Sequence, residues 1–359
     1  MNFTDKNGYY KILDAFKGIA ILLVVATHTS QMYELPVFLK RICEFGQMGC
    51  QLFLVISGFN LMNSWIKKNI SVSKFYINRW LSLAPGYWIT ILFFFSLNIL
   101  RSFVGKGMPI SSFAKGSLVN LFLLNGFIPK YNNNIVPGGW YVGTTVILYL
   151  LFPAIGLFMH KNIEKRNMLK SYVFPGFCAL ILGCIIGVIN YATTNTVFLE
   201  NNSFLYFSVA NQFPCFLCGI ILYFRLQDIN AKQKRDWKCV LLSIILLIFS
   251  FLLFNSTLEI RYYFVPILTS ISVALLLEYF MTIKVEGLKV FRLLGKESYG
   301  IYLIHSIFSY QLSAIVEQII GMNNVFVFVP MYILIVIFSL AFGRCINYFA
   351  NKVKKLKFR

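Results

Sequence analysis

Two polar groups interrupt an otherwise apolar stretch near the start of the chain. Lys17 and His28 lie eleven residues apart in FKGIAILLVVATHTSQMY, residues 16–33. A helix would separate them by about 16 Å along its axis. A neutral imidazole serves near pH 7 as a general base, a nucleophile, a proton relay or a metal ligand. The alternatives without chemistry are a core histidine with satisfied hydrogen bonds and a lysine that extends to the lipid headgroups.

The composition around these residues is that of a membrane protein. Apolar residues make up 58% of the 359 residues and charged residues only 13%, roughly half the usual fraction of a soluble domain. We therefore expect an all-α integral membrane protein, with a single transmembrane domain over residues 1–359 and no separate soluble domain. Apolar runs predict about ten transmembrane helices, at residues 13–33, 47–66, 84–104, 140–160, 172–193, 204–224, 239–256, 262–282, 298–320 and 325–349.

Basic residues predict the orientation of these helices. With a cytoplasmic N-terminus, 24 of the 33 Lys and Arg residues fall in cytoplasmic segments and 7 in outer segments, so both termini are expected to be cytoplasmic. The net charge of +20 then reflects membrane topology, and no basic segment forms a module for nucleic acid. The longest outer loop, about 105–139, contains YNNNIVPGG and is expected to bind or cover a ligand. The apolar run at 117–129 is too short to cross the bilayer.

Neither a metal site nor an ion-coupled transporter is favoured. Cys215 and Cys218 have CxxC spacing, but they lie on an apolar run without a second pair, so no metal is expected. A transporter or flippase of a lipid-linked sugar, with His28 as a proton relay, is the alternative function. It would predict paired buried carboxylates or inverted repeats. Glu278 and Glu317 instead lie toward span ends, and the sequence shows no internal repeat.

Five stretches, taken in order, resemble the acyltransferase-3 family. LDAFKGIAILLVVATHTS is similar to the family's first helix, in which a basic residue and a histidine are separated by ten residues. The other four are GCQLFLVISGFNLM (49–62), KFYINRWLSLAPGYW (74–88), GGWYVGTTVILYLLFP (138–153) and LGKESYGIYLIHSIF (294–308). Three positions depart from the pattern: Lys17 and Ser82 stand where the family usually has Arg, and Thr145 stands where many members have Glu.

The resemblance implies a membrane O-acetyltransferase that moves an acetyl group from cytoplasmic acetyl-CoA to a sugar hydroxyl. His28 would act as general base, or as a nucleophile that forms an acyl-histidine. Lys17 and Arg79 would bind the phosphates of acyl-CoA, although positive-inside topology alone also explains Arg79. Ser57 and Gly58 would form a small helix face, against which either another helix or the pantetheine chain of the donor packs closely.

Three aromatic residues and one histidine complete the predicted site. Tyr302 and His305 share one helix face, and His305 would orient His28, contact substrate, or remain a core histidine. Trp140 and Tyr149 bracket the fourth span, as interface anchors or as rings that stack on a sugar. The implied partners are acyl-CoA, a polysaccharide or lipid-linked glycan acceptor and the lipid bilayer of a bacterial inner (plasma) membrane. Homo-oligomerisation stays open.

Overall fold

A computed structural model describes residues 9–68, 70–103, 105–162, 168–194, 206–232, 237–258 and 260–356. Helices make up most of these residues, and no strand occurs among them. The α-helices are α1 (Lys11–Ser30), α2 (Val37–Phe45), α3 (Gly49–Lys68), α4 (Val72–Phe103), α5 (Ile110–Leu121), α6 (Gly139–Asn162), α7 (Met168–Thr194), α9 (Val209–Lys232), α10 (Lys238–Phe254), α11 (Arg261–Phe280), α12 (Lys289–Ile307), α13 (Ser313–Ile320) and α14 (Val325–Leu356). Short 3-10 helices η1 (Gly46–Met48) and η2 (Pro129–Tyr131) and the π-helix η4 (Phe308–Leu312) lie between them.

Eight helices within the described ranges are long and apolar enough to cross a membrane, which confirms the all-helical membrane class. They correspond to eight of the predicted spans. The α10 helix has 17 residues, about 25 Å, somewhat less than the ~30 Å hydrocarbon core. The expected span 298–320 is divided among α12, η4 and α13. The count of ten and the cytoplasmic termini stay predictions. Several predicted segments lie partly outside the described residues. They are the ones that include residues 1–8, 163–167, 195–205, 233–236 and 357–359.

The chain forms two compact units, each built from separate stretches of sequence. The helices α1, α2, α6 and α12 contribute residues to both units. The first unit comprises Met1–Ala20, Phe45–Ile70 and Leu151–Lys296, and the second comprises Ile21–Glu44, Ser71–Leu150 and Glu297–Arg359.

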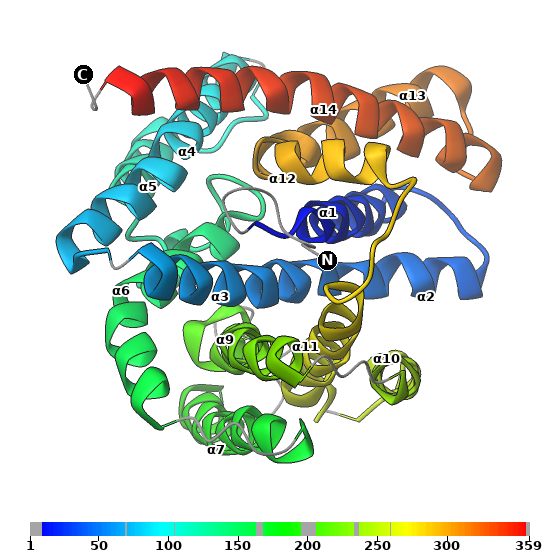
Figure 1. Ribbon diagram of the computed structural model, residues 1–359. Helices are drawn as coiled ribbons and strands as arrows, with labels where there is room; N and C mark the ends of the chain where they lie inside the picture. Colours follow the sequence, from blue (N-terminus) through cyan, green and yellow to red (C-terminus); the bar gives the residue numbers. More distant parts are fainter. Residues whose placement is uncertain are drawn as a thin grey trace. The chain divides into compact units, whose positions relative to one another are not determined.

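Close packing of helices stabilises the first unit, and at two glycines no side chain separates the helix backbones. The α3 helix lies on α9, and α10 lies on α11 (Figure 1). The first of these contacts is close because Gly58 faces the carbonyl oxygen of Phe216, and Gly219 faces that of Val55. A buried ion pair joins α9 to α11: Arg225 donates from Nε and Nη2 to the two carboxylate oxygens of Glu278, at 2.6 and 2.7 Å. The pair satisfies a charge that would be costly alone in an apolar interior.

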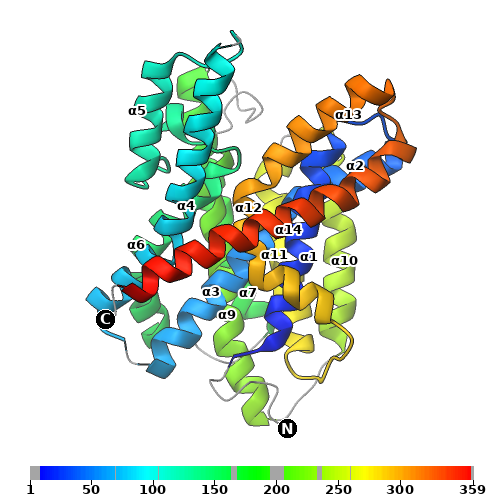
Figure 2. The same cartoon turned by 90° about the horizontal axis from the view of Figure 1, so that it is seen from above.

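The second unit contains an ordered form of the long loop expected at 105–139. The α4 helix packs against α5 and α14, and Figure 2 shows α5 alongside α4. After α5, buried asparagines tie the loop to itself: Asn125 Nδ2 donates to the Gly139 carbonyl at 2.8 Å, and Asn132 Nδ2 to the Asn125 carbonyl at 3.3 Å. Tyr87 of α4 donates its hydroxyl to Asn120 Oδ1. These bonds satisfy loop backbone groups that have no helical partner.

The glycine contact between α3 and α9 predicts a position-specific effect on stability. In Gly219→Ala, the new methyl group meets the Val55 carbonyl, and we expect destabilisation by about 1–3 kcal/mol from overpacking. The matched control is Gly176→Ala in α7, where an added Cβ has nothing within 4 Å. This change should be neutral, or stabilising by up to about 1 kcal/mol through helix propensity. Thermal midpoints of the purified protein in detergent measure both effects, and equal midpoints would contradict the packing argument.

Candidate active site

His28 lies in the last turn of α1, within the second unit, and its Nδ1 atom is 2.8 Å from the hydroxyl of Tyr310. That hydroxyl donates to Gln31 Oε1 at 2.6 Å. With Gln31 Oε1 turned toward it, the single hydrogen of the tyrosine hydroxyl is donated to the amide and the hydroxyl accepts from His28, which assigns the imidazole proton to Nδ1. The lone pair of the neutral ring is therefore on Nε2. The arrangement leaves Nε2 as the atom that accepts a proton or attacks a carbonyl carbon.

Tyr310 reaches His28 from a π-helix, Phe308–Leu312, that follows α12. The wider turn of a π-helix changes the direction of the side chains it carries, and such turns are frequent at functional sites. A second contact fixes this segment to α1, because the hydroxyls of Ser309 and Thr29 are 3.2 Å apart. Lys40 Nζ donates to the Ser30 carbonyl at the end of α1. Both sides of the His28 turn are thus held in place.

His305 is the second imidazole of this cluster. It is fully buried, and its ring centroid is 5.1 Å from that of His28. Its Nδ1 atom is 2.7 Å from the carbonyl oxygen of Tyr302, so Nδ1 carries the proton that is donated. Within the described ranges, Nε2 of His305 has no hydrogen-bond partner. The two rings thus have the same tautomer, and the structure leaves one nitrogen of His305 for a further partner.

Tyr302 ties the outer loop to α12. Its hydroxyl donates to the Gly138 carbonyl at 2.8 Å, and its ring lies 5.3 Å from that of Tyr141. Gly138 has φ +86°, a left-handed conformation that favours glycine, and a Cβ there would also crowd the Tyr302 hydroxyl. Tyr302 therefore holds the end of the loop. Trp140, two residues later, is only 7% exposed, which leaves little of its indole for the membrane interface.

Arg79 and Tyr149, which the sequence suggests for different roles, lie together in the second unit. The Arg79 guanidinium is 5.9 Å from the centre of the Tyr149 ring and 5.8 Å from that of Phe75. Aromatic faces stabilise a cation in this way. Arg79 Nε is buried and has no hydrogen-bond partner among the residues described. Ser82, at the position where the family usually has a second Arg, donates to the Arg79 carbonyl of its own helix.

A cavity of about 320 Å³ lies in the same unit as His28, and Tyr310 forms part of its wall. The cavity is an open pocket bordered by the end of α4, the outer loop, the end of α12 and the π-helix. Its other lining residues are Phe94, Leu97, Asn98, Arg101, Lys106, Met108, Phe113, Asn134, Ile135, Pro137, Ser306, Ile307 and Gln311.

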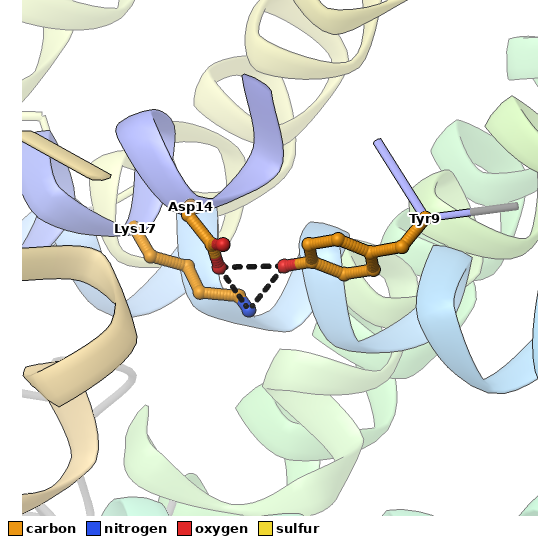
Figure 3. A network of polar contacts seen from close by, with 3 residues as sticks. All are labelled: Tyr9, Asp14 and Lys17. Atoms are coloured by element: carbon orange, nitrogen blue, oxygen red, sulfur yellow. Dashed lines mark hydrogen bonds and ion pairs between the residues drawn. The ribbon is translucent and has the colours of Figure 1, made fainter. Parts of the chain in front are cut away.

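Lys17 belongs to the first unit and takes part in a network with Asp14 and Tyr9 (Figure 3). Its ammonium is 3.3 Å from Asp14 Oδ1 and 3.1 Å from the Tyr9 hydroxyl, which donates to the same carboxylate oxygen at 2.6 Å. The Asp14 side chain is 8% exposed and that of Lys17 is 24% exposed. Two of the three ammonium hydrogens are used here, and the third has no acceptor among the described residues.

The first unit also contains a basic cavity of about 520 Å³. Lys11, Lys284, Lys289 and Arg292 line it, and the one acidic residue, Glu286, pairs with Lys284 at 2.6 Å. The hydrogen bond between them raises the pKa of Lys284 and lowers that of Glu286, so both are charged at neutral pH. The lining therefore has a net positive charge, which suits a polyanion.

Ser57 and Gly58 lie on α3 of the first unit, where the Phe216 carbonyl of α9 occupies the space beside Gly58. The structure thus gives Gly58 a helix-packing role. Among the residues described, no group of three His, Cys, Asp or Glu side chains could hold a metal ion.

Sequence reasoning missed Tyr310, Gln31 and the lining of the smaller cavity. Gln31 follows His28 by three residues, which is the spacing of neighbours on a helix face. Tyr310 follows His305 by five residues, a spacing that shares a face in a π-helix but not in an α-helix. Nothing in the sequence signals the π-turn.

Comparison with known proteins agrees with the family resemblance. The sequence profile of the acyltransferase 3 family, described as an acyltransferase domain, matches residues 10–344. The chain is 24% identical over 326 residues to the peptidoglycan O-acetyltransferase OatA of Listeria monocytogenes, with 83% of this chain and 49% of OatA covered. It is 25% identical over 193 residues to regulator of hypoxia-inducible factor 1 of Caenorhabditis elegans, with 46% and 37% covered. The chain thus spans half or less of these relatives. No solved structure matches it.

Proposed function

Because the chain belongs to the acyltransferase 3 family, we propose that it is a membrane O-acetyltransferase. It moves an acetyl group from acetyl-CoA to a hydroxyl of a cell-surface polysaccharide or lipid-linked glycan. The observation that carries the proposal is His28, whose Nδ1–H is bonded to Tyr310 so that Nε2 keeps its lone pair. The similarity to a peptidoglycan O-acetyltransferase supports a glycan acceptor.

The charge distribution supports an orientation for this enzyme in a bacterial inner membrane. Both termini are cytoplasmic in the proposed topology of ten spans, because 24 basic residues then lie inside and 7 outside. The basic cavity with Lys289 and Arg292 then faces the cytoplasm, where acetyl-CoA is made. The outer loop, the end of α4 and the smaller cavity face the side on which a surface glycan is found.

In the first of two reaction routes, His28 is a general base. The acceptor oxygen attacks the thioester carbonyl carbon while its proton passes to Nε2 of His28. The carbon–sulfur bond then breaks, and the leaving thiolate takes that proton from the imidazolium. General base catalysis contributes typically 10²–10⁴-fold. Tyr310 accepts the Nδ1–H bond throughout and keeps the ring in one orientation.

In the second route, His28 is the nucleophile. Nε2 attacks the thioester carbonyl carbon, the carbon–sulfur bond breaks, and an acetyl-histidine forms. The acceptor hydroxyl then attacks the acetyl carbon, the bond from that carbon to Nε2 breaks, and the hydroxyl proton passes to another base, which delivers it to the CoA thiolate. His305 suits this step, because its Nε2 has no partner among the described residues and its ring is 5.1 Å from that of His28. Both routes use the same nitrogen of His28.

We further propose that the cavity of the first unit binds the phosphates of acetyl-CoA, with Lys289 and Arg292 as its principal cations. Lys gives a point charge and Arg a planar fork, and phosphates use both. Lys17, in the same unit, has one ammonium hydrogen left for the donor. Arg79, with its unpartnered Nε, is a further candidate for an anionic group of the donor.

Replacement of His28 tests the function directly. We expect His28→Ala to abolish acetylation, because no other group supplies Nε2. His160→Ala is the matched control: this exposed histidine stacks on Phe224 and has no proposed role. The measurement is the acetyl content of surface glycans, by mass spectrometry, in cells with the gene deleted and restored as wild type or either variant. Full acetylation with His28→Ala would exclude His28 as the catalytic group. Unchanged acetylation on deletion, with lipid-linked sugars accumulating inside, would favour the transporter.

Tyr310→Phe should lower kcat about fivefold, which corresponds to the loss of one hydrogen bond of about 1 kcal/mol. Without the hydroxyl, His28 loses the acceptor that fixes its tautomer, while the ring packing is retained. KM for acetyl-CoA should not change. Tyr332→Phe is the matched control, since this tyrosine also bonds to α1, but through the Leu22 carbonyl. Steady-state transfer by the purified enzyme measures both variants. An equal loss of kcat in both, or none in Tyr310→Phe, would contradict the positioning role.

The donor site predicts a change in KM rather than in kcat. Lys289→Gln combined with Arg292→Gln should raise KM for acetyl-CoA about tenfold or more, as expected for lost charge-assisted hydrogen bonds. We choose Lys289 and Arg292 for this test instead of Lys17, because removal of Lys17 would leave the buried Asp14 carboxylate without an ion pair. Lys352→Gln, an exposed lysine of α14, serves as the control. An unchanged KM in the double variant would place the donor elsewhere.

A further inference from the structure

We propose that the 320 Å³ cavity beside Tyr310 is the acceptor subsite, and that it binds a sugar residue carrying a carboxylate or a phosphate group. The assignment rests on the acetyltransferase function proposed above. It goes beyond that function because it gives the acceptor a charge and assigns the residues that select it. Four features of the cavity, all within the second unit, support it.

The first feature is direct connection to the catalytic group. Tyr310 lines the cavity, and its hydroxyl bonds to His28 Nδ1 at 2.8 Å. Ser306, also in the lining, is the residue next to His305. A molecule in this cavity is therefore in contact with the residue that bonds to His28 and with the chain neighbour of His305.

The second feature is a buried hydroxyl without a partner. Ser306 is 1% exposed, and its Oγ makes no hydrogen bond to the described residues. A buried hydroxyl without a partner costs free energy that a ligand hydroxyl would recover. By contrast, the Asn98 side chain already bonds through both its amide nitrogen and its oxygen to the backbone of Met108, so its main role is to hold the cavity wall.

The third feature is the combination of apolar and polar walls. The rings of Phe94 and Phe113 are largely buried, and amides of Asn134 and Gln311 lie on the more exposed side. Ligand sites typically combine apolar walls with a few such polar groups, in cavities of about 300–1,000 Å³. At about 320 Å³ this cavity is at the small end, which suits one sugar residue of a longer chain.

The fourth feature is charge. Arg101 and Lys106 line the cavity, and the described lining contains no Asp or Glu. In the proposed topology both lie outside, among only 7 basic residues there. Positive-inside topology therefore does not account for them. A concave site with charge of one sign attracts ligands of the opposite sign, and a guanidinium recognises carboxylate and phosphate alike.

The test is direct binding to the full-length protein in detergent, independent of catalysis. Apparent affinities come from the dependence of the thermal midpoint on ligand concentration. The probes are methyl β-D-glucuronide for a carboxylate, glucose 6-phosphate for a phosphate, and methyl β-D-glucoside for a neutral sugar. At least one anionic sugar should bind about tenfold more tightly than the glucoside. Whichever anion binds more tightly identifies the group on the acceptor.

Three variants connect this preference to the cavity. Arg101→Gln combined with Lys106→Gln should remove the preference for the anionic sugar. Lys115→Gln, an exposed outer lysine of α5 that is not part of the lining, should keep it. Ser306→Ala should weaken binding of every sugar without lowering the midpoint of the ligand-free protein, because the lost hydroxyl has no partner there. If Ser306 had only a structural role, Ser306→Ala would lower the midpoint of the ligand-free protein and leave sugar binding unchanged.

Several results would overturn the proposal. They are absence of binding by both anionic sugars, equal binding of all three sugars, or a preference that survives in the double variant. Coenzyme A binding that depends on Arg101 and Lys106 would instead make this the donor site. Because binding is measured without turnover, the result is separable from the function: His28→Ala should still bind the anionic sugar while it loses transfer. Binding together with full transfer by His28→Ala would refute the function but keep the site.

Discussion

The hydrogen bond from His28 to Tyr310 is the constraint on which the proposed chemistry depends. A neutral imidazole has one proton, and the partner of one nitrogen decides whether the other is a base. Gln31 assigns this proton, because its Oε1 accepts the Tyr310 hydrogen and the hydroxyl then accepts from Nδ1. Were the hydroxyl turned toward the ring, Nε2 would carry the proton and lose its nucleophilicity. An amide three residues from His28 thus controls the reactive nitrogen through a tyrosine 282 positions away.

How much the sequence predicts depends on the range of the physical signal. Hydropathy is a strong signal that neighbouring residues in the sequence provide, so the helical membrane class and eight spans follow from the apolar runs. The spacing of Lys17 and His28, together with the family resemblance, singles out the imidazole. The π-turn at Phe308–Leu312 has no such signature, so Tyr310 is invisible until the helices are packed. Positive-inside counting likewise treats every outer or inner cation alike, and cannot separate Arg101 or Arg292 from topological charges.

Buried polar atoms without a partner among the described residues occur in both units, and three of them belong to residues of the proposed site. His305 Nε2, Ser306 Oγ and Arg79 Nε are buried without partners among the described residues, and all lie in the unit that holds His28. Each such group costs about 1–3 kcal/mol. The buried carboxylate of Glu278, by contrast, is fully paired, because Nε and Nη2 of Arg225 each donate to one of its oxygens. A site that must receive a donor and an acceptor needs groups left open in this way.

Departures from the family pattern have local reasons that indicate what each position requires. An arginine would offer a carboxylate two parallel hydrogen bonds. Here the lysine ammonium and the Tyr9 hydroxyl converge on one oxygen of Asp14, so two side chains do what a guanidinium does alone. What Lys17 shares with the family's arginine is charge rather than fork geometry. At Ser82 the charge is absent and the hydroxyl bonds to its own helix, which leaves Arg79 without a neighbouring arginine. The cation proposed to bind an anion there is Arg79, whose guanidinium lies near the rings of Phe75 and Tyr149.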